Sequence, residues 1–257
     1  MALVATLIAN PSNPVLTPAL GEAVFTAVDG TGLYWLADGI ACDIALRDGA
    51  DKAAALSAIR KVIGELPIDA AVQIAETRRK KILIADMDST MIGQECIDEL
   101  AAEVGLKERV SEITARAMNG EIAFEPALRE RVGLLKGLPV EVIAQVIENR
   151  ITLTPGGREL VATMRASGHY TALVSGGFTS FTSVVAAMIG FDENRANILE
   201  SENGVLSGIV REPILGKQAK VDALNDIAAR LNLDPADAIA IGDGANDLGM
   251  LGIAGSG

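Results

Sequence analysis

Residues 81–90 read Lys-Ile-Leu-Ile-Ala-Asp-Met-Asp-Ser-Thr, an apolar run of strand length that ends in two carboxylates one residue apart. In an open α/β sheet, ligands bind at the carboxyl ends of the strands. Asp86 and Asp88 would repel each other there unless a cation or a shared proton relieved the repulsion. A hard divalent cation with oxygen ligands, such as Mg²⁺, is a suitable partner. Because a helix cap followed by a turn would also explain an isolated motif of this kind, the interpretation depends on the rest of the chain.

Three later segments add complementary chemistry. Residues 173–178 read Leu-Val-Ser-Gly-Gly-Phe, where glycines allow a close backbone approach to an anion and the start of the next helix offers free N–H groups. Lys220, with Lys217 nearby, begins a segment of helical period, although a lysine in such a place is usually solvated surface. Residues 238–247 read Ala-Ile-Ala-Ile-Gly-Asp-Gly-Ala-Asn-Asp, a second apolar strand followed by an acidic loop. Together these segments supply a nucleophile, a second acid, an anion cradle, a cation and carboxylates for a metal.

This set of motifs resembles that of the haloacid dehalogenase-like phosphatases and, within that superfamily, is closer to the phosphoserine phosphatases. The stretches that carry the resemblance are residues 86–90, 95–100, 117–120, 124–131, 175–178, Lys220 and residues 242–247. The resemblance covers about residues 80–257 and implies an α/β fold, a Rossmann-like parallel sheet with an inserted helical cap. It also implies Mg²⁺-dependent hydrolysis of O-phospho-L-serine, the last step of serine biosynthesis. Members of the family continue with a further strand and helix beyond the point that corresponds to Gly257.

The resemblance assigns catalytic roles to Asp86, Asp88 and Lys220. Asp86 attacks phosphorus and becomes an aspartyl phosphate, which divides a difficult hydrolysis into two displacements. Asp88 is the acid toward the leaving oxygen and then the base for the attacking water. The implied Mg²⁺ ligands are Asp86, the backbone carbonyl of Asp88, and Asp243, with Asp247 and Asn246 alongside. The implied phosphate contacts are Ser175, the Gly176 amide and Lys220, and Asn246 is also an implied substrate contact.

Specificity for an amino-acid phosphate requires partners for an ammonium and a carboxylate. By resemblance, Glu95 binds the ammonium, and Arg131 presents a planar fork to the carboxylate. Met118 and Phe124 are expected to form apolar walls of the cap against the substrate. The alternative interpretation of Arg131 is an ordinary residue on a helix surface.

The composition is that of an enzyme for small molecules. A formal charge of −12 over 257 residues argues against nucleic-acid binding, since that affinity rests on lysine and arginine. An anionic substrate therefore requires cations concentrated inside the site. We expect no membrane association and a cytoplasmic protein, because the sequence has neither a long apolar stretch nor a basic, then apolar leader. The oligomeric state is left open, with a homodimer as one arrangement.

The pattern along the chain predicts two domains. Residues 1–78 alternate as strand, helix, two strands, helix and strand, which indicates a small ferredoxin-like α+β domain similar to ACT-type modules. Residues 77–81, Thr-Arg-Arg-Lys-Lys, are interpreted as a solvated linker. Residues 79–257 form the predicted phosphatase core, with a helical cap at about residues 97–150. After the cap, alternating helices and strands are expected to form one parallel sheet.

Two other functions remain open at the level of sequence. A phosphotransferase that passes the phosphoryl group to an alcohol such as homoserine needs the same machinery as a hydrolase. A receiver-like module, in which Asp86 is phosphorylated as a signal, has no small-molecule pocket to close. The predicted cap with Glu95 and Arg131 argues against the second of these.

Overall fold

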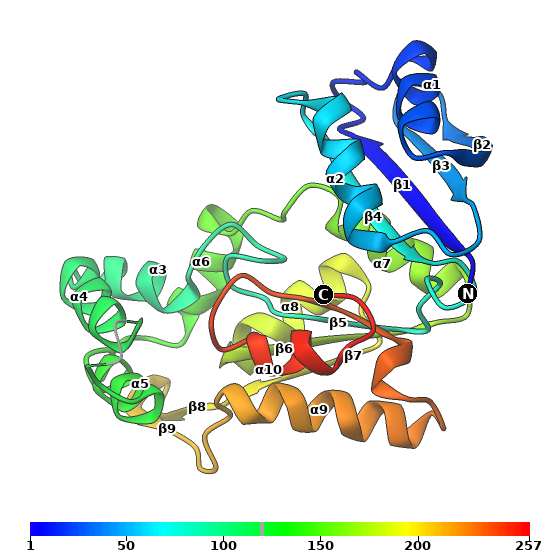
Figure 1. Cartoon of the computed structure of the whole chain (residues 1–257). Coiled ribbons are helices and arrows are strands. Elements are labelled where there is room, and N and C mark those ends of the chain that lie inside the picture. Colours follow the sequence, from blue (N-terminus) through cyan, green and yellow to red (C-terminus); the bar gives the residue numbers. More distant parts are fainter. Residues whose placement is uncertain (119–120) are drawn as a thin grey trace. The chain divides into compact units, whose positions relative to one another are not determined.

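The computed structural model describes residues 1–118 and 121–257, except for the side chain of Met118. The chain separates into two compact units, Met1–Arg79 and Lys80–Gly257, and each is described by itself (Figure 1). Within the described residues, no helix combines the length and the apolar character that crossing a bilayer requires.

The N-terminal unit has the predicted β-α-β-β-α-β order. Its elements are β1 (Leu3–Ala9), α1 (Pro18–Ala27), β2 (Gly30–Ala37), β3 (Ala41–Leu46), α2 (Lys52–Ile63) and β4 (Ile68–Ile74). The antiparallel sheet has the order β2-β3-β1-β4, and both helices contribute to one apolar core. This topology is ferredoxin-like, whereas the similarity to ACT-type modules and the boundary at residue 78 stay predictions.

Local signals explain where these elements begin. The Thr17 hydroxyl accepts a hydrogen bond from the Leu20 amide (3.2 Å), and Pro18 occupies the first helical position of α1. The Asp51 carboxylate caps α2 by accepting from the Ala54 amide at 2.7 Å. β2 begins at Gly30, because pairing with β3 extends through Gly30 and Gly32, although glycine is uncommon in strands.

The basic segment after β4 is less solvated than predicted. Arg78 forms an ion pair with the buried Asp43 carboxylate of β3 at 2.5 Å. Lys80 is 8% exposed and donates to the backbone carbonyl of Ala236 at 2.9 Å. The prediction of a solvated run is therefore wrong for these two residues, because each finds an acceptor within its own unit.

The second unit is built on a four-stranded parallel sheet of order β10-β5-β6-β7. Its strands and their connecting helices are β5 (Ile82–Ala85), α7 (Gly157–Ala166), β6 (Tyr170–Phe178), α8 (Thr179–Ile189), β7 (Glu193–Asn197), α9 (Lys217–Arg230), the 3₁₀ turn η1 (Pro235–Asp237), β10 (Ala238–Ile241) and α10 (Leu248–Ile253). The chain leaves β5 toward β6 on one side, while β10 pairs on the other. This reversal of direction is the switch point at which α/β sheets bind ligands.

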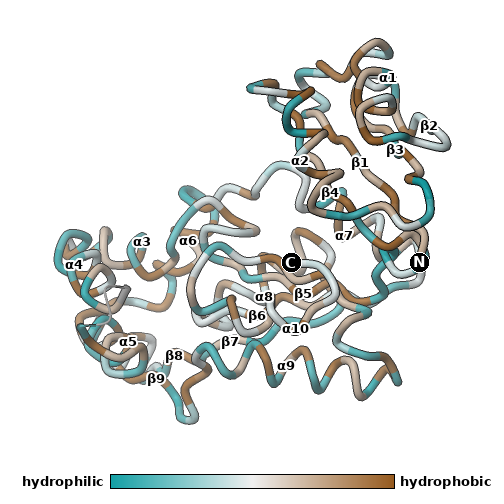
Figure 2. Tube along the Cα trace, in the orientation of Figure 1, coloured by the Kyte–Doolittle hydropathy of each residue, from teal (hydrophilic) through white to brown (hydrophobic). Residues whose placement is uncertain are grey.

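Helices cover both faces of this sheet. This is required because successive side chains of β5 point to opposite faces and all four are apolar. Leu83 and Ala85 belong to one apolar cluster with α7 and α8, whereas Ile82 and Ile84 belong to another with α9 and α10. All four residues are fully buried. Figure 2 shows the result as apolar central strands and an α9 that alternates between hydrophilic and hydrophobic residues along its length. The predicted Rossmann-like architecture is confirmed.

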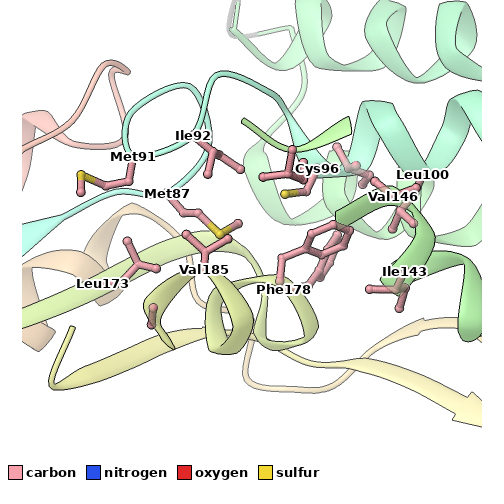
Figure 3. Close-up of a cluster of buried hydrophobic side chains, with 14 of the residues drawn as sticks. Met87, Met91, Ile92, Cys96, Leu100, Ile143, Val146, Leu173, Phe178 and Val185 are labelled. Atoms are coloured by element: carbon pink, nitrogen blue, oxygen red, sulfur yellow. The ribbon is translucent and has the colours of Figure 1, made fainter. Parts of the chain in front are cut away.

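A helical cap is inserted between β5 and α7. It contains α3 (Cys96–Glu103), α4 (Lys107–Met118), α5 (Phe124–Gly133) and α6 (Glu141–Arg150). The two chain segments that join it to the core pair with each other through an antiparallel bridge between Ile92 and Leu153. The apolar cluster under the cap is continuous with the core, and Figure 3 shows Met87 and Phe178 of the core near Cys96 and Leu100 of α3.

One part of this unit was not predicted. β8 (Leu199–Glu202) and β9 (Val205–Val210) form an antiparallel hairpin outside the parallel sheet. Asn203 (φ 52°) and Gly204 (φ 81°) make its turn. The hairpin contacts the connection between α5 and α6, where the Leu206 amide donates to the Leu138 carbonyl at 2.8 Å. The expectation that every later strand joins one parallel sheet is therefore wrong, because Asn-Gly favours a tight hairpin.

Candidate active site

Asp86 lies one residue beyond β5, at the switch point of the sheet. Its amide donates to the Ile241 carbonyl at 2.9 Å, so pairing with β10 continues to the first residue of the loop. The Met87 amide donates to Asp86 Oδ1 at 2.7 Å, which fixes the carboxylate at the strand end. Asp86 is 5% exposed. The sheet thus places a buried carboxylate at the ligand-binding edge, as the sequence predicts.

Lys220 is the cation of this site, not a solvated surface residue. It lies in the first turn of α9 and is 2% exposed. Its Nζ lies 2.5 Å from Asp86 Oδ2 and 2.6 Å from Asp247 Oδ1. Burial raises the pKa of Asp86 to about 6, with the Lys220 charge opposing and the Asp247 charge assisting that shift. One ammonium therefore leaves the carboxylate repulsion only partly relieved.

Three carboxylates form a cluster suited to a metal ion. Asp86, Asp243 and Asp247 each place one oxygen within 4.8 Å of the others. A Cβ at Gly242 would lie 2.2 Å from Asp247 Cγ, so a glycine is needed for the loop to turn this closely around the carboxylate. Hard oxygen donors on fixed strand ends fit a divalent cation such as Mg²⁺.

Two polar neighbours support the cluster. Thr90 Oγ1 donates to Asp243 Oδ1 at 3.0 Å, which joins the two acidic loops. Asn246 Nδ2 lies 3.5 Å from Asp86 Oδ2, so this amide faces the predicted nucleophile.

Asp88 occupies a different position from the metal cluster. Its carboxylate accepts from the Cys96 amide (2.9 Å) and from Ser175 Oγ (3.3 Å). Burial raises the pKa of Asp88, and these hydrogen bonds oppose the rise. A raised pKa favours a carboxyl group that can give up and take back a proton. Its backbone carbonyl stays the predicted metal ligand.

The predicted phosphate cradle is the end of β6. Ser175 is 3% exposed, and its Oγ accepts from the Gly177 amide at 2.8 Å. β6 continues through both glycines to Phe178, and α8 begins at Thr179. A Cβ at Gly177 would lie 2.7 Å from Asp88 Oδ2. The glycine is therefore needed for the acid to approach the strand.

Phe124, the first residue of α5, packs over this end of β6. A Cβ at Gly176 would lie 3.2 Å from Phe124 Cζ, so the ring lies directly above the predicted phosphate contact. The ring is half-buried. The cap thereby places an apolar ring over this end of β6, and the contact of Phe124 with substrate stays a prediction. Met118 ends α4, and its predicted contact with substrate lies outside the described residues.

Glu95 precedes the first residue of α3 and makes no capping bond with that helix. Its Oε1 instead accepts from Ser89 Oγ at 2.6 Å. Partial burial, helped by the negative charges of Asp88 and Asp243, raises the pKa of Glu95 to about 7 while part of the side chain stays exposed. Ser89, in a left-handed conformation with φ 52°, was not singled out from the sequence. Nothing in a Ser-Thr pair predicts that geometry.

Arg131 is 7% exposed, so the alternative of a surface residue is wrong. Its Nε donates to the Ala127 carbonyl (3.2 Å), and its Nη1 donates to Thr114 Oγ1 (3.0 Å). Within the described part of the chain, no carboxylate lies within ion-pair distance of it. Burial lowers the pKa of Arg131, while the charges of Asp98, Glu95 and Asp88 oppose that shift. A buried arginine with uncommitted donors can bind an anion.

Comparison with known proteins places this geometry in a family. Residues 83–252 match the family of haloacid dehalogenase-like hydrolases. The chain is 42% identical over 217 residues to a phosphoserine phosphatase of Archaeoglobus fulgidus, covering 84% of this chain and 62% of that protein. It is 46% identical over 180 residues to a phosphoserine phosphatase of Albidiferax ferrireducens, covering 68% of this chain and 76% of that protein.

A solved structure supports the same assignment. The haloacid dehalogenase family hydrolase from Salmonella enterica serovar Typhi superposes with a TM-score of 0.84 at 31% identity, covering 99% of this chain and 87% of that one. The chain spans about three fifths of the Archaeoglobus protein, 62% of its length. The strand-end carboxylates, the buried lysine and these matches agree, and the chain belongs to the haloacid dehalogenase-like hydrolase family.

Proposed function

We propose that the protein is a phosphatase that hydrolyses O-phospho-L-serine to L-serine and phosphate. The observation that carries this proposal is the combination of two groups of residues. Asp86, Asp88 and Lys220 suit phosphoryl transfer, and the cap adds a carboxylate and a buried arginine, Glu95 and Arg131. The relatives named above are phosphoserine phosphatases, which supports the same substrate.

In the first step, an oxygen of Asp86 attacks phosphorus, and the bond from phosphorus to the serine oxygen breaks. The Asp88 carboxyl group gives its proton to that leaving oxygen, so that serine departs as the neutral alcohol. Lys220 already lies 2.5 Å from the nucleophile, where its charge offsets the negative charge that the phosphoryl group brings. The product of this step is an aspartyl phosphate on Asp86.

In the second step, water attacks the phosphorus of the aspartyl phosphate. The Asp88 carboxylate takes a proton from that water, and the bond between phosphorus and Asp86 breaks. Phosphate leaves, and both aspartates return to their starting forms. The hydrogen bond from Ser175 Oγ to Asp88 at 3.3 Å supports an acid on the phosphate side of the site.

We propose Mg²⁺ as the cofactor, held by Asp86, Asp243 and the backbone carbonyl of Asp88, with Asp247 and Asn246 alongside. When bound, this cation supplies the charge neutralisation that lets an anionic carboxylate approach an anionic phosphate. The oxygen-only donor set and the spacing within 4.8 Å support a hard divalent ion. Ser175, the Gly176 amide and Lys220 bind the phosphoryl oxygens.

The proposal is tested by phosphate release from a panel of monoesters with Mg²⁺. The panel contains L-phosphoserine, phosphothreonine, phosphoethanolamine and a sugar phosphate. We expect kcat/KM to be highest for L-phosphoserine, because only this substrate matches both Glu95 and Arg131 without an additional methyl group. Preference for the sugar phosphate would contradict the assignment. A second assay with homoserine present separates hydrolysis from transfer, since transfer yields a phosphorylated alcohol in place of free phosphate.

A further inference from the structure

Asp98, in the first turn of α3, has an oxygen whose hydrogen bonding is incomplete. Its Oδ2 accepts from Ser111 Oγ of α4 at 2.9 Å. Its Oδ1 is buried and has no hydrogen-bond partner among the described residues. Leaving a buried carboxylate oxygen without a donor is costly, so it indicates a donor that arrives in another state of the protein.

Arg131 of α5 has the complementary deficit. A guanidinium carries five N–H donors, and here the Ala127 carbonyl and the Thr114 hydroxyl take one each. Three N–H groups therefore have no protein acceptor in the described part of the chain. Of the carboxylates that act on this guanidinium, Asp98 acts most strongly, ahead of Glu95 and Asp88.

α4 brings the two side chains together. Ser111 holds Asp98 and Thr114 holds Arg131, and these two residues are three positions apart on one face of the helix. α3 packs against α4, and α4 packs against α5. The unpaired acceptor and the unpaired donors thus lie on two helices that both pack against α4, and the charge of Glu95 also acts on Arg131.

We propose that Asp98 is a positioning residue for Arg131 and hence a determinant of specificity for substrates with an α-carboxylate. When the substrate carboxylate takes two N–H groups of the fork, Asp98 Oδ1 accepts the fifth and fixes the plane of the guanidinium. All five donors and the buried Oδ1 are then satisfied. This inference rests on the proposed function, since it assigns the carboxylate of phosphoserine to Arg131.

The test uses four proteins: the wild type, Asp98→Asn, Arg131→Ala and the double variant. We expect Asp98→Asn to lower kcat/KM for L-phosphoserine roughly 5- to 30-fold, mainly through KM, because a charge-assisted bond that orients the fork is lost. The kcat/KM for phosphoethanolamine, which has no carboxylate, should change less than about twofold. In the Arg131→Ala background, Asp98→Asn should have no further effect on either substrate.

Glu99→Gln is the matched control. It removes the same charge from the neighbouring position of α3, but Glu99 is already paired with Lys107 (2.9 Å) and Arg150 (3.2 Å). We expect the ratio of phosphoserine to phosphoethanolamine activity to stay at the wild-type value. A shifted ratio in this variant would attribute the effect to overall charge, and that result overturns the proposal.

Thermal unfolding of the same four proteins without substrate gives a reading that does not depend on phosphoserine. The charge of Asp98 already acts on the Arg131 guanidinium in the substrate-free protein, so each single variant removes the same attraction, and the double variant should lose less Tm than the two single losses added together. If the losses of Tm are subadditive but the protein does not hydrolyse phosphoserine, the proposed function is refuted and the Asp98–Arg131 pairing is still supported. Additive losses, equal kinetic losses on both substrates, or an undiminished Asp98→Asn effect in the Arg131→Ala background would overturn the pairing.

Discussion

Replacing Arg131 by alanine tests whether the cap recognises an amino acid. In the structure Arg131 is 7% exposed, and the two protein hydrogen bonds of its guanidinium lie within the cap. Those bonds go to Ala127 and Thr114, which are groups of the protein, so we expect their loss to affect the free and the bound enzyme alike. What differs is the charge-assisted, bidentate contact with the substrate carboxylate.

Such a contact in a closed site is worth about 2–4 kcal/mol. The expected loss in kcat/KM for L-phosphoserine is therefore roughly 30- to 1,000-fold. Phosphoethanolamine retains the phosphate and the ammonium but has no carboxylate, so its slower hydrolysis should hardly change. Steady-state kinetics with both substrates on the same preparation give the ratio directly.

Arg129→Ala is the control for this prediction. Arg129 lies on the same helix, but it is exposed and pairs with Glu212 at 2.6 Å and Glu125 at 3.4 Å. Its removal should leave the substrate ratio unchanged. Equal losses on both substrates in Arg131→Ala would mean that the cap had been disordered, and the reasoning from carboxylate recognition would then be refuted.

Three further predictions concern the carboxylates at the strand ends. Asp86→Asn should abolish turnover and aspartyl-phosphate formation, while circular dichroism shows an intact fold. Substantial residual hydrolysis by this variant would refute the assignment of Asp86 as the nucleophile. Hydrolysis should require Mg²⁺ and be inhibited by Ca²⁺, because the larger ion accepts more oxygens and can draw both oxygens of Asp86 into coordination; equal rates with the two ions would contradict this site. In chelator, burial holds the pKa of Asp86 at about 6, against 3.8 for an ordinary aspartate, so the folded protein keeps a proton that the unfolded chain releases. The stabilisation is present below the unfolded pKa and is lost as pH rises through about 6, a change of about 2–3 kcal/mol that denaturant titrations should show in the wild type but not in Asp86→Asn.

The parts of this site that could be predicted from sequence are those carried by short contiguous motifs. Asp86 follows an apolar strand directly, and the Gly-Asp-Gly loop repeats that arrangement after β10. Parallel pairing of β5 with β10 then brings the two loops together at one sheet edge. Strand-end chemistry of this kind needs no knowledge of the surrounding helices.

The parts that could not be predicted depend on tertiary packing. Helical period places Arg131 on α5 but does not say which face of that helix is covered, and only the packed cap shows the side chain to be buried. Asp98 reads as an acidic residue in the first turn of a helix, where a carboxylate is ordinarily favourable. Its incomplete hydrogen bonding becomes visible only when α4 is in place.

The β8–β9 hairpin is a different case, because its signal was present in the sequence. Asn203-Gly204 is a strong hairpin motif, and both residues have the positive φ that its turn requires. The alternation of helices and strands that predicts a single parallel sheet contains no information about this turn. Where turn chemistry and fold class disagree over a few residues, the turn chemistry is the more local constraint.

The charge of the protein and the charge of its proposed substrate are reconciled at the strand ends. The cluster sets three carboxylates, Asp86, Asp243 and Asp247, against the single ammonium of Lys220. By this count the site has a net negative charge without a metal ion and repels a phosphate dianion. A divalent cation held by the carboxylates brings the count to neutrality, so the net charge of −12 does not have to be reversed over the surface. If this proposal holds, phosphate affinity should depend on prior cation binding, because Lys220 is already paired with two carboxylates.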